Sequence, residues 1–175
     1  SYAQQQSGND AGSVRLGCIP TIAPFLLTDL VLQSQKKLPK LALYLREDTT
    51  ENLMLQLADG DIDCAILALP VPTHDFESRS LGEDAFYIAG EKSLVTQFVE
   101  TQRYDSLPQK SVFLLNQEHC LTEHAISACK LTDRSKINDF SASSIATLVQ
   151  MTAFHQGVTF LPAMAIKKGL GELEG

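Results

Sequence analysis

The stretch LADGDIDCAILAL, residues Leu57–Leu69, indicates how this chain folds. Its first residues complete a segment with leucines at helical spacing, and that segment ends at Gly60. The six residues from Cys64 onwards are all apolar and stop before Pro70. A short apolar run between turn signals is typical of a strand that is buried on both faces, as in a parallel sheet. The stretch therefore predicts a helix followed by one strand of a parallel sheet.

The same alternation extends in both directions. Before this stretch we expect strands at Val14–Cys18 and Leu41–Leu45, separated by a helix over Pro24–Lys37. Strands that alternate with helices in this way predict an α/β fold, with two Rossmann-like lobes in series joined by a hinge near residues 82–90. The expected elements after this stretch are, in chain order, Ala85–Ala89 (strand), Ser111–Leu115 (strand), Leu121–Ala128 (helix), Ile137–Phe140 (strand), Ser143–Phe154 (helix) and Val158–Leu161 (strand).

Four regions are expected along the chain. Residues 1–12 are small and polar, which is typical of a linker tail. Residues 13–83 are expected to form the first lobe, and residues 84–166 the second. Residues 167–175 are expected to begin a segment that returns to the first lobe. Because the chain lacks an initiator Met and shows no closing helix or strand after Pro162, we expect further chain on both sides.

The composition excludes several classes of protein. The net charge is −7, and Lys and Arg do not cluster, so this segment is not expected to bind nucleic acid by itself. No apolar run approaches the ~20 residues of a membrane helix, so no membrane partner is expected. Among the four cysteines, Cys18 and Cys64 lie in apolar runs, where we expect buried thiols rather than structural disulfides. These features favour a reducing, cytoplasmic location.

The other two cysteines, Cys120 and Cys129, close the stretch HCLTEHAISAC that begins at His119. Nine residues of intact helix would separate them by about 13.5 Å along its axis and leave their side chains on opposite faces. A disulfide needs Cα atoms roughly 4.4–6.8 Å apart. The pair can therefore join only if the helix unwinds, which is the behaviour expected of a redox switch.

Cys120 is the first candidate for chemistry. Just before a helix, in a capping-box-like arrangement with Glu123, its thiolate would be stabilised by unpaired N–H groups, by the helix dipole and by His119, whereas Glu118 and Glu123 oppose ionisation. Two unrelated cysteines remain an alternative. So does a zinc site, although no CxxC is present. Its ligands would be His119, Cys120, His124 and Cys129. We expect no bound metal and no cofactor, since no phosphate-binding loop, GxSxG or HExxH occurs.

Three hydroxyl side chains follow predicted strands. Thr21 and Thr50 come after the first two, where ligands of open α/β sheets bind. Ser143 occupies the same kind of position later in the chain. These side chains could hydrogen-bond a small polar ligand. The alternative is that they only cap helices, with Asp48 as a competitor of Thr50 for the second helix.

Three segments carry a family resemblance: GCIPTIAPFLL (Gly17–Leu27), LADGDIDCAILAL (Leu57–Leu69) and QGVTFLPAMA (Gln156–Ala165). They resemble the regulatory domain of LysR-type transcriptional regulators. HCLTEHAISAC is similar to the sensing segment of peroxide-responsive members of that family. The resemblance implies two periplasmic-binding-protein-like subdomains joined by a hinge, of which the second carries the redox cysteines.

The resemblance also implies roles for residues. Cys120 would be the peroxidatic thiol and Cys129 its resolving partner, while His119, Thr21 and Thr50 would help to hold hydrogen peroxide. Ser143 matches a further hydroxyl position. Peroxide would convert Cys120 to a sulfenic acid, and the disulfide with Cys129 would remodel the helix and switch transcription. The protein would therefore be a stoichiometric sensor and not an enzyme.

The resemblance implies partners outside this segment. DNA would be bound by an N-terminal winged helix-turn-helix, regulatory domains would self-associate within a dimer or tetramer, and a glutaredoxin-like thiol reductant would reset the switch. Two features depart from the family. Thr122 stands where peroxide-responsive members often carry a basic residue, and the C-terminal return segment is missing. A metabolite-binding LysR domain and a thiol peroxidase remain competing hypotheses.

Overall fold

The computed structural model describes residues 12–73, 75–116, 118–128 and 130–168. It divides into two compact units between Leu67 and Ala68. This boundary precedes the expected division at residues 83 and 84. Of the predicted linker tail, Gly12 already belongs to the first strand and residues 1–11 lie outside the described residues.

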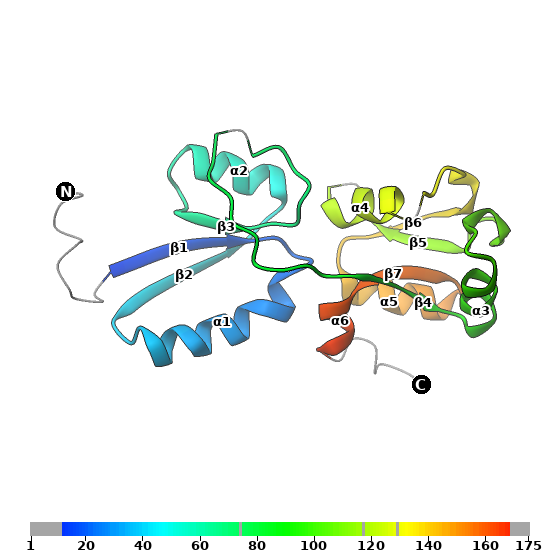
Figure 1. Ribbon diagram of the computed structural model, residues 1–175, viewed down its shortest axis with the longest axis horizontal. Helices are drawn as coiled ribbons and strands as arrows, with labels where there is room; N and C mark the ends of the chain where they lie inside the picture. The colour runs from blue at the N-terminus through cyan, green and yellow to red at the C-terminus, as the bar shows by residue number, and fades with distance from the viewer. Residues whose placement is uncertain (1–11, 74, 117, 129, 169–175) are drawn as a thin grey trace. The chain divides into compact units, whose positions relative to one another are not determined.

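The first unit is a three-stranded parallel sheet in the order β2-β1-β3 (Figure 1). The connection from β1 to β2 contains α1, and the connection from β2 to β3 contains α2. The two connections run in opposite directions across the sheet and both are expected to be right-handed, so the two helices lie on opposite faces. Gly17 permits the close packing of α2, since a Cβ there would lie only 2.5 Å from a methyl carbon of Leu53. The elements are β1 (Gly12–Cys18), α1 (Ala23–Lys37), β2 (Leu41–Glu47), α2 (Thr50–Ala58) and β3 (Cys64–Ile66).

The second unit has a four-stranded sheet in the order β4-β7-β5-β6. β5 runs parallel to both neighbours, whereas β4 is antiparallel to β7. A cluster around Val112, Leu114, Val158 and Phe160 forms the core on this sheet. The elements are β4 (Phe86–Gly90), α3 (Lys92–Thr101), η2 (Tyr104–Ser106), β5 (Val112–Leu115), α4 (Cys120–Ala128), η3 (Arg134–Lys136), β6 (Ile137–Ala142), α5 (Ile145–Phe154), β7 (Val158–Pro162) and α6 (Ala163–Lys167).

The α/β class is confirmed, and the strand predicted at Ala85–Ala89 is β4, which pairs with β7 in the second unit. Other local features differ from the expectation. The helix α3 was not predicted, and α6 follows Pro162 directly, where no closing element was expected. Of the predicted return segment, only residues 167 and 168 are described. None of the helices in the described part of the chain is both long and apolar enough to cross a membrane.

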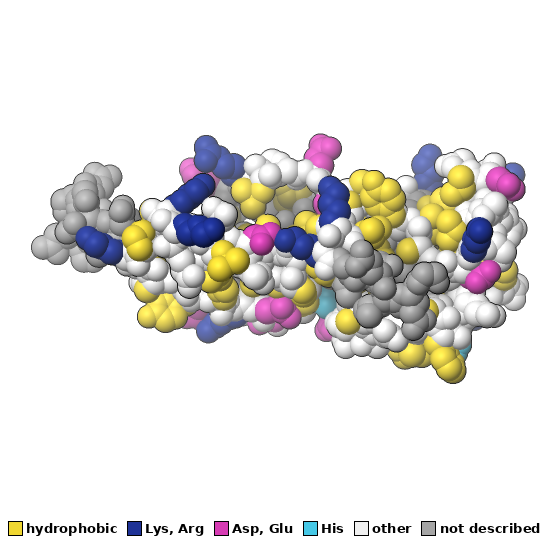
Figure 2. Space-filling model, turned by 90° about the horizontal axis from the view of Figure 1, so that it is seen from below, with side chains coloured by type: hydrophobic (Ala, Val, Ile, Leu, Met, Phe, Trp, Pro, Cys, Tyr) yellow, Lys and Arg dark blue, Asp and Glu magenta, His cyan; other side chains and the backbone are white. Residues whose placement is uncertain are grey.

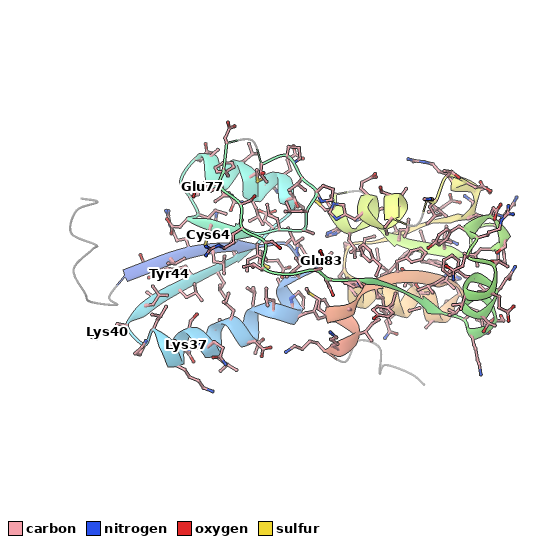
Figure 3. All side chains as sticks on the ribbon, viewed as in Figure 1. Lys37, Lys40, Tyr44, Cys64, Glu77 and Glu83 are labelled. Carbon is pink, nitrogen blue, oxygen red and sulfur yellow. The ribbon has the colours of Figure 1, made fainter. Side chains whose placement is uncertain are left out.

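Apolar side chains also reach the surface of the first unit. Tyr44 lies on the edge strand β2 and is 61% exposed (Figure 3). Exposed leucines lie on the same strand and around α1. Figure 2 shows exposed hydrophobic side chains, in yellow, between charged ones. These leucines are Leu32, Leu38 and Leu45.

Candidate functional site

The junction between β5 and α4 positions Cys120. All four residues of β5 are buried, so the strand fixes where the following turn begins. The Asn116 N–H donates to the Ala142 carbonyl of the neighbouring β6, and the His119 N–H donates back to the Asn116 carbonyl. Cys120 is then the first residue of α4 and is half-buried. The predicted capping box is therefore out of register, since Cys120 lies inside the helix and not before it.

Thr122 ties the first turn of α4 to the end of β5. Its hydroxyl is buried and donates to the Leu115 carbonyl at 2.9 Å and to the Asn116 carbonyl at 3.3 Å. A hydroxyl that satisfies two carbonyls at a strand end holds the helix start against the sheet. This role of Thr122 could not be predicted from the sequence, because the acceptors lie outside α4.

His119 is a buried polar side chain directly before Cys120. It is 5% exposed, and its Nε2 has no hydrogen-bond partner within the described residues. The Glu118 Oε1 lies 3.7 Å from this nitrogen, which is beyond hydrogen-bonding range. Buried polar atoms are nearly always paired, so an imidazole nitrogen in this state is available to a small polar molecule.

His124 lies one turn after Cys120 on α4. Its Nε2 is 3.1 Å from the carbonyl oxygen of Pro70, in the segment between β3 and β4. The described residues contain no group of three or more His, Cys, Asp or Glu side chains that could hold a metal ion, so the zinc-site alternative gains no support from them. Cys129, the predicted resolving cysteine, lies outside the described residues.

The three predicted hydroxyl residues do not cap helices. Thr21 is buried in the turn before α1, whose N-cap is Ile22 without a side-chain bond. Thr50 is the first residue of α2, and its neighbour Thr49 is the cap. Thr21 and Thr50 both follow the carboxyl ends of adjacent parallel strands, and so lie at the same edge of the first sheet. The remaining hydroxyl, that of Ser143, is exposed in the second unit, where Ser144 caps α5.

A family model described as LysR substrate binding domain matches residues 7–174. The chain belongs to this LysR family. Among its curated relatives is the HTH-type transcriptional regulator EstR of Acinetobacter baylyi, 38% identical over 89% of this chain and 51% of EstR. Another is the hydrogen peroxide-inducible genes activator of Pectobacterium carotovorum, 31% identical over 95% of this chain and 55% of that protein. The chain thus spans about half the length of these regulators.

Solved structures place this LysR domain with OxyR. The reduced form of the regulatory domain of OxyR2 from Vibrio vulnificus is 53% identical, with a TM-score of 0.86 over 94% of this chain and 78% of that one. The predicted resemblance is thereby confirmed for the family and for its OxyR members.

The remaining cysteines of the LysR domain differ from each other. Cys18 is fully buried at the end of β1, and burial, with a smaller contribution from Glu47, raises the pKa of its thiol to about 12. Cys64, at the start of β3, is exposed and not buried as expected (Figure 3). Partial burial and the neighbouring Asp63 raise the pKa of its thiol. The apolar run was misleading because β3 ends at Ile66, after only three residues.

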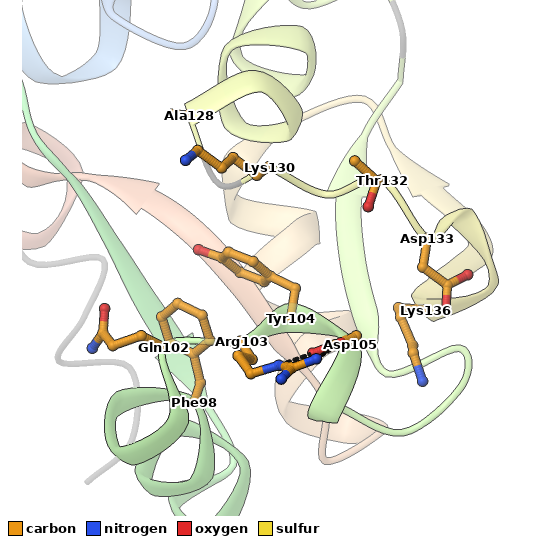
Figure 4. Close-up of a pocket in the computed structure, with 10 residues that line it drawn as sticks. All are labelled: Phe98, Gln102, Arg103, Tyr104, Asp105, Ala128, Lys130, Thr132, Asp133 and Lys136. Carbon is orange, nitrogen blue, oxygen red and sulfur yellow. Dashed lines mark hydrogen bonds and ion pairs between the residues drawn. The ribbon is translucent and has the colours of Figure 1, made fainter.

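A pocket of about 410 Å³ lies beyond the last turn of α4 (Figure 4). Its charges largely pair with each other. The Arg103 hydrogen bond lowers the pKa of the Asp105 carboxyl, hydrogen bonds from Ser135 lower that of Asp133, and Lys136 makes a smaller contribution in the same direction to both. Lys130 also lines the pocket, directly after the α4 end. The pocket therefore offers little net charge to a ligand. The other lining residues are Phe98, Gln102, Tyr104, Ala128 and Thr132.

Proposed function

We propose that this chain is the regulatory domain of a peroxide-sensing LysR-type transcriptional regulator, in which Cys120 is the thiol that hydrogen peroxide oxidises. The observation that carries the proposal is a half-buried cysteine at a helix start, directly preceded in the chain by a buried histidine whose Nε2 has no hydrogen-bond partner among the described residues. The peroxide-inducible activator and OxyR2 among its relatives support the same reading.

The first chemical step is a displacement on oxygen. The Cys120 thiolate attacks one oxygen of hydrogen peroxide, the O–O bond breaks, and the other oxygen leaves as hydroxide, which becomes water on protonation. Sulfur is oxidised to the sulfenic acid and peroxide is reduced. The His119 Nε2 is suited to hydrogen-bond the peroxide or the leaving oxygen, since no described residue occupies it. Thr21, Thr50 and Ser143 are proposed as further hydroxyl contacts for peroxide, on the family resemblance.

The second step forms the disulfide. The Cys129 thiol attacks the Cys120 sulfenic sulfur and water leaves, which balances the reaction. An intact helix would hold residues nine positions apart about 13.5 Å from each other along its axis. α4 must therefore unwind and release the Thr122 bonds to the end of β5. The free energy of the new S–S bond offsets that loss, and the altered surface becomes the signal.

The wider activity belongs to the longer protein. We propose DNA binding by an N-terminal winged helix-turn-helix outside this chain, self-association through the regulatory domain, and reset by a glutaredoxin-like thiol reductant. The exposed Tyr44 and leucines on β2 and α1 support self-association, because apolar surface on an edge strand favours contact with another chain.

Mass spectrometry of the peptide from His119 to Lys130 tests this function. One equivalent of peroxide should produce the Cys120–Cys129 disulfide, with a loss of two hydrogens. In a Cys129→Ser variant the same treatment should stop at the Cys120 sulfenic acid. Unmodified thiols after one equivalent would refute the proposal. Consumption of many equivalents with an added reductant would instead favour a thiol peroxidase.

A second candidate is a LysR domain that binds a small anionic metabolite through Thr21, Thr50 and Ser143. The description of the matched family model as a substrate binding domain favours it. Cys120→Ser separates the two. A full-length Cys120→Ser protein that still responds to peroxide in a transcription assay would exclude the sensor reading.

A further inference from the structure

The contact between His124 and Pro70 joins α4 to a distant part of the chain. Pro70 lies 54 residues earlier, in the segment between β3 and β4, and its carbonyl oxygen is 3.1 Å from the His124 Nε2. A carbonyl oxygen only accepts hydrogen bonds, so Nε2 carries the proton and donates it. Thus two side chains of α4 hydrogen-bond to other parts of the chain. Thr122 donates to the end of β5, and His124 donates to the segment between β3 and β4.

His124 is also placed where the proposed reaction must act. It stands four residues after Cys120, on the same face of α4 and one turn further on. It lies near the middle of the nine-residue span that must unwind before Cys120 and Cys129 can join. Unwinding at this position is expected to move the imidazole away from Pro70. The helical form of α4 has this hydrogen bond, and we expect the disulfide form to lose it.

We propose that His124 is a positioning residue that holds α4 helical against the Pro70 segment and so limits how fast the Cys120 sulfenic acid proceeds to the disulfide. The inference rests on the proposed function. When Cys129 attacks the sulfenic sulfur and water leaves, the His124 bond must already be broken. Its release also frees Pro70, which transmits the rearrangement to the segment that connects β3 with β4.

Helix propensity predicts the opposite effect, which makes the inference testable. Alanine is the best helix former, so His124→Ala should by itself favour the helix and slow the disulfide step. Loss of the hydrogen bond should instead favour unwinding. Ser127→Ala is a matched control, because Ser127 lies on α4 with an exposed side chain and gains the same kind of propensity. His124→Gln is the conservative variant, since its amide can donate to Pro70 from a similar distance.

The experiment follows two rates in the full-length reduced protein after one equivalent of peroxide. Sulfenic acid formation is trapped with dimedone in a Cys129→Ser background, and disulfide formation is followed by mass spectrometry. Relative to the Ser127→Ala control, which carries the same kind of propensity gain, His124→Ala should accelerate the disulfide step about three- to tenfold, as loss of one net hydrogen bond predicts, and leave sulfenic acid formation unchanged. His124→Gln and Ser127→Ala should stay within about twofold of the parent. Amide exchange in reduced α4 should rise in His124→Ala alone.

The outcomes separate the two proposals. Equal disulfide rates in Ser127→Ala and in His124→Ala overturn the role of His124 and leave the sensing function standing. A His124→Gln rate as high as that of His124→Ala also overturns it, because the imidazole would then act by packing and not by donating. If dimedone never labels Cys120 in the Cys129→Ser protein, the sensing function itself fails, and the inference with it.

Discussion

Two strand-to-helix junctions in this molecule carry a cysteine, and their surroundings are opposite. At the end of β1, Cys18 is fully buried, and backbone hydrogen bonds tie the strand end to its neighbours. The Ile19 N–H donates to the Ile66 carbonyl, and the Asp48 N–H donates to the Cys18 carbonyl. At the start of α4, Cys120 is half-buried beside a buried imidazole. The same kind of topological position thus provides an inert thiol in one unit and a candidate reactive thiol in the other.

The difference lies in which groups satisfy the turn. The first junction is closed by backbone hydrogen bonds and buried side chains, Thr21 among them, and its N-cap, Ile22, offers no side-chain bond. The second uses the Thr122 hydroxyl, donated to the strand end, and leaves the His119 Nε2 without a partner in the described chain. Polar side chains placed at a strand end can be reorganised, whereas a backbone-closed turn resists change. This contrast can be tested by mutation and by thiol chemistry.

Alkylation should give the largest contrast. With its pKa raised to about 12, Cys18 has a thiolate fraction near 10⁻⁴ at pH 8, against about one quarter for an ordinary thiol. We expect iodoacetamide to label Cys18 in native protein about three orders of magnitude more slowly than in urea-unfolded protein. Peptide mass spectrometry gives both rates. Fast native labelling of Cys18 would erase the difference between the two junctions.

Thr122→Val should be the most destabilising change at the second junction. It removes the buried hydroxyl that donates to the Leu115 carbonyl at the end of β5, which costs about 1–3 kcal/mol of unfolding free energy. The Asn116 carbonyl, the second acceptor, keeps the His119 N–H. Thr152→Val is the matched control. The Thr152 hydroxyl is also buried but bonds the Leu148 carbonyl within its own helix, and that carbonyl keeps its helical N–H partner. Urea denaturation followed by circular dichroism compares them, and equal losses would contradict the anchoring role of Thr122.

Alkaline pH should weaken the first junction. The folded pKa of Cys18 lies above its unfolded value, so the thiol contributes stability that is complete below about pH 9 and is lost as pH rises towards 12. Relative to Cys18→Ala, the parent should lose about 1–2 kcal/mol between pH 8 and pH 10. The comparison cancels the titration of other groups. Parallel stability curves for the two proteins over this range would show that burial does not hold the thiol neutral.

Much of the fold could be predicted because apolar periodicity encodes it. The strands β1, β2, β5 and β7 begin or end within two residues of the expected bounds, since each is short, mostly apolar and bounded by turn signals. The helix α3 was missed although its pattern was present: Leu94, Val95 and Phe98 lie at helical spacing and pack, partly buried, against the core of the second unit. Cys64 was misjudged because burial depends on what covers a strand, which the run of apolar residues does not reveal.

The candidate site was predictable only in part. The helix after Cys120 and the proximity of His119 follow from adjacency in the sequence, and both are present. Thr122 and His124 could not be assigned roles, because their acceptors, Leu115 and Pro70, become neighbours only through the fold. Capping residues were misplaced by one position at two helices. Thr49 stands beside Thr50, and Ser144 beside Ser143, so the choice depends on backbone dihedrals and not on residue type.

A third junction, between β6 and α5, gives the smallest expected effect and sharpens the contrast. There the Ser144 hydroxyl accepts the Thr147 N–H at 3.2 Å, so a side chain caps the helix itself and not the strand end. Ser144→Ala should lower the unfolding free energy by about 1 kcal/mol. Ser143→Ala removes only an exposed hydroxyl, so it should change the unfolding free energy by no more than about 0.5 kcal/mol. Ser144→Ala should leave the rate of Cys120 oxidation unchanged if α5 stays helical. Ser143→Ala should slow this oxidation without a loss of stability, because Ser143 is proposed as one of the hydroxyls that hold peroxide. An unchanged oxidation rate in Ser143→Ala would remove Ser143 from that set.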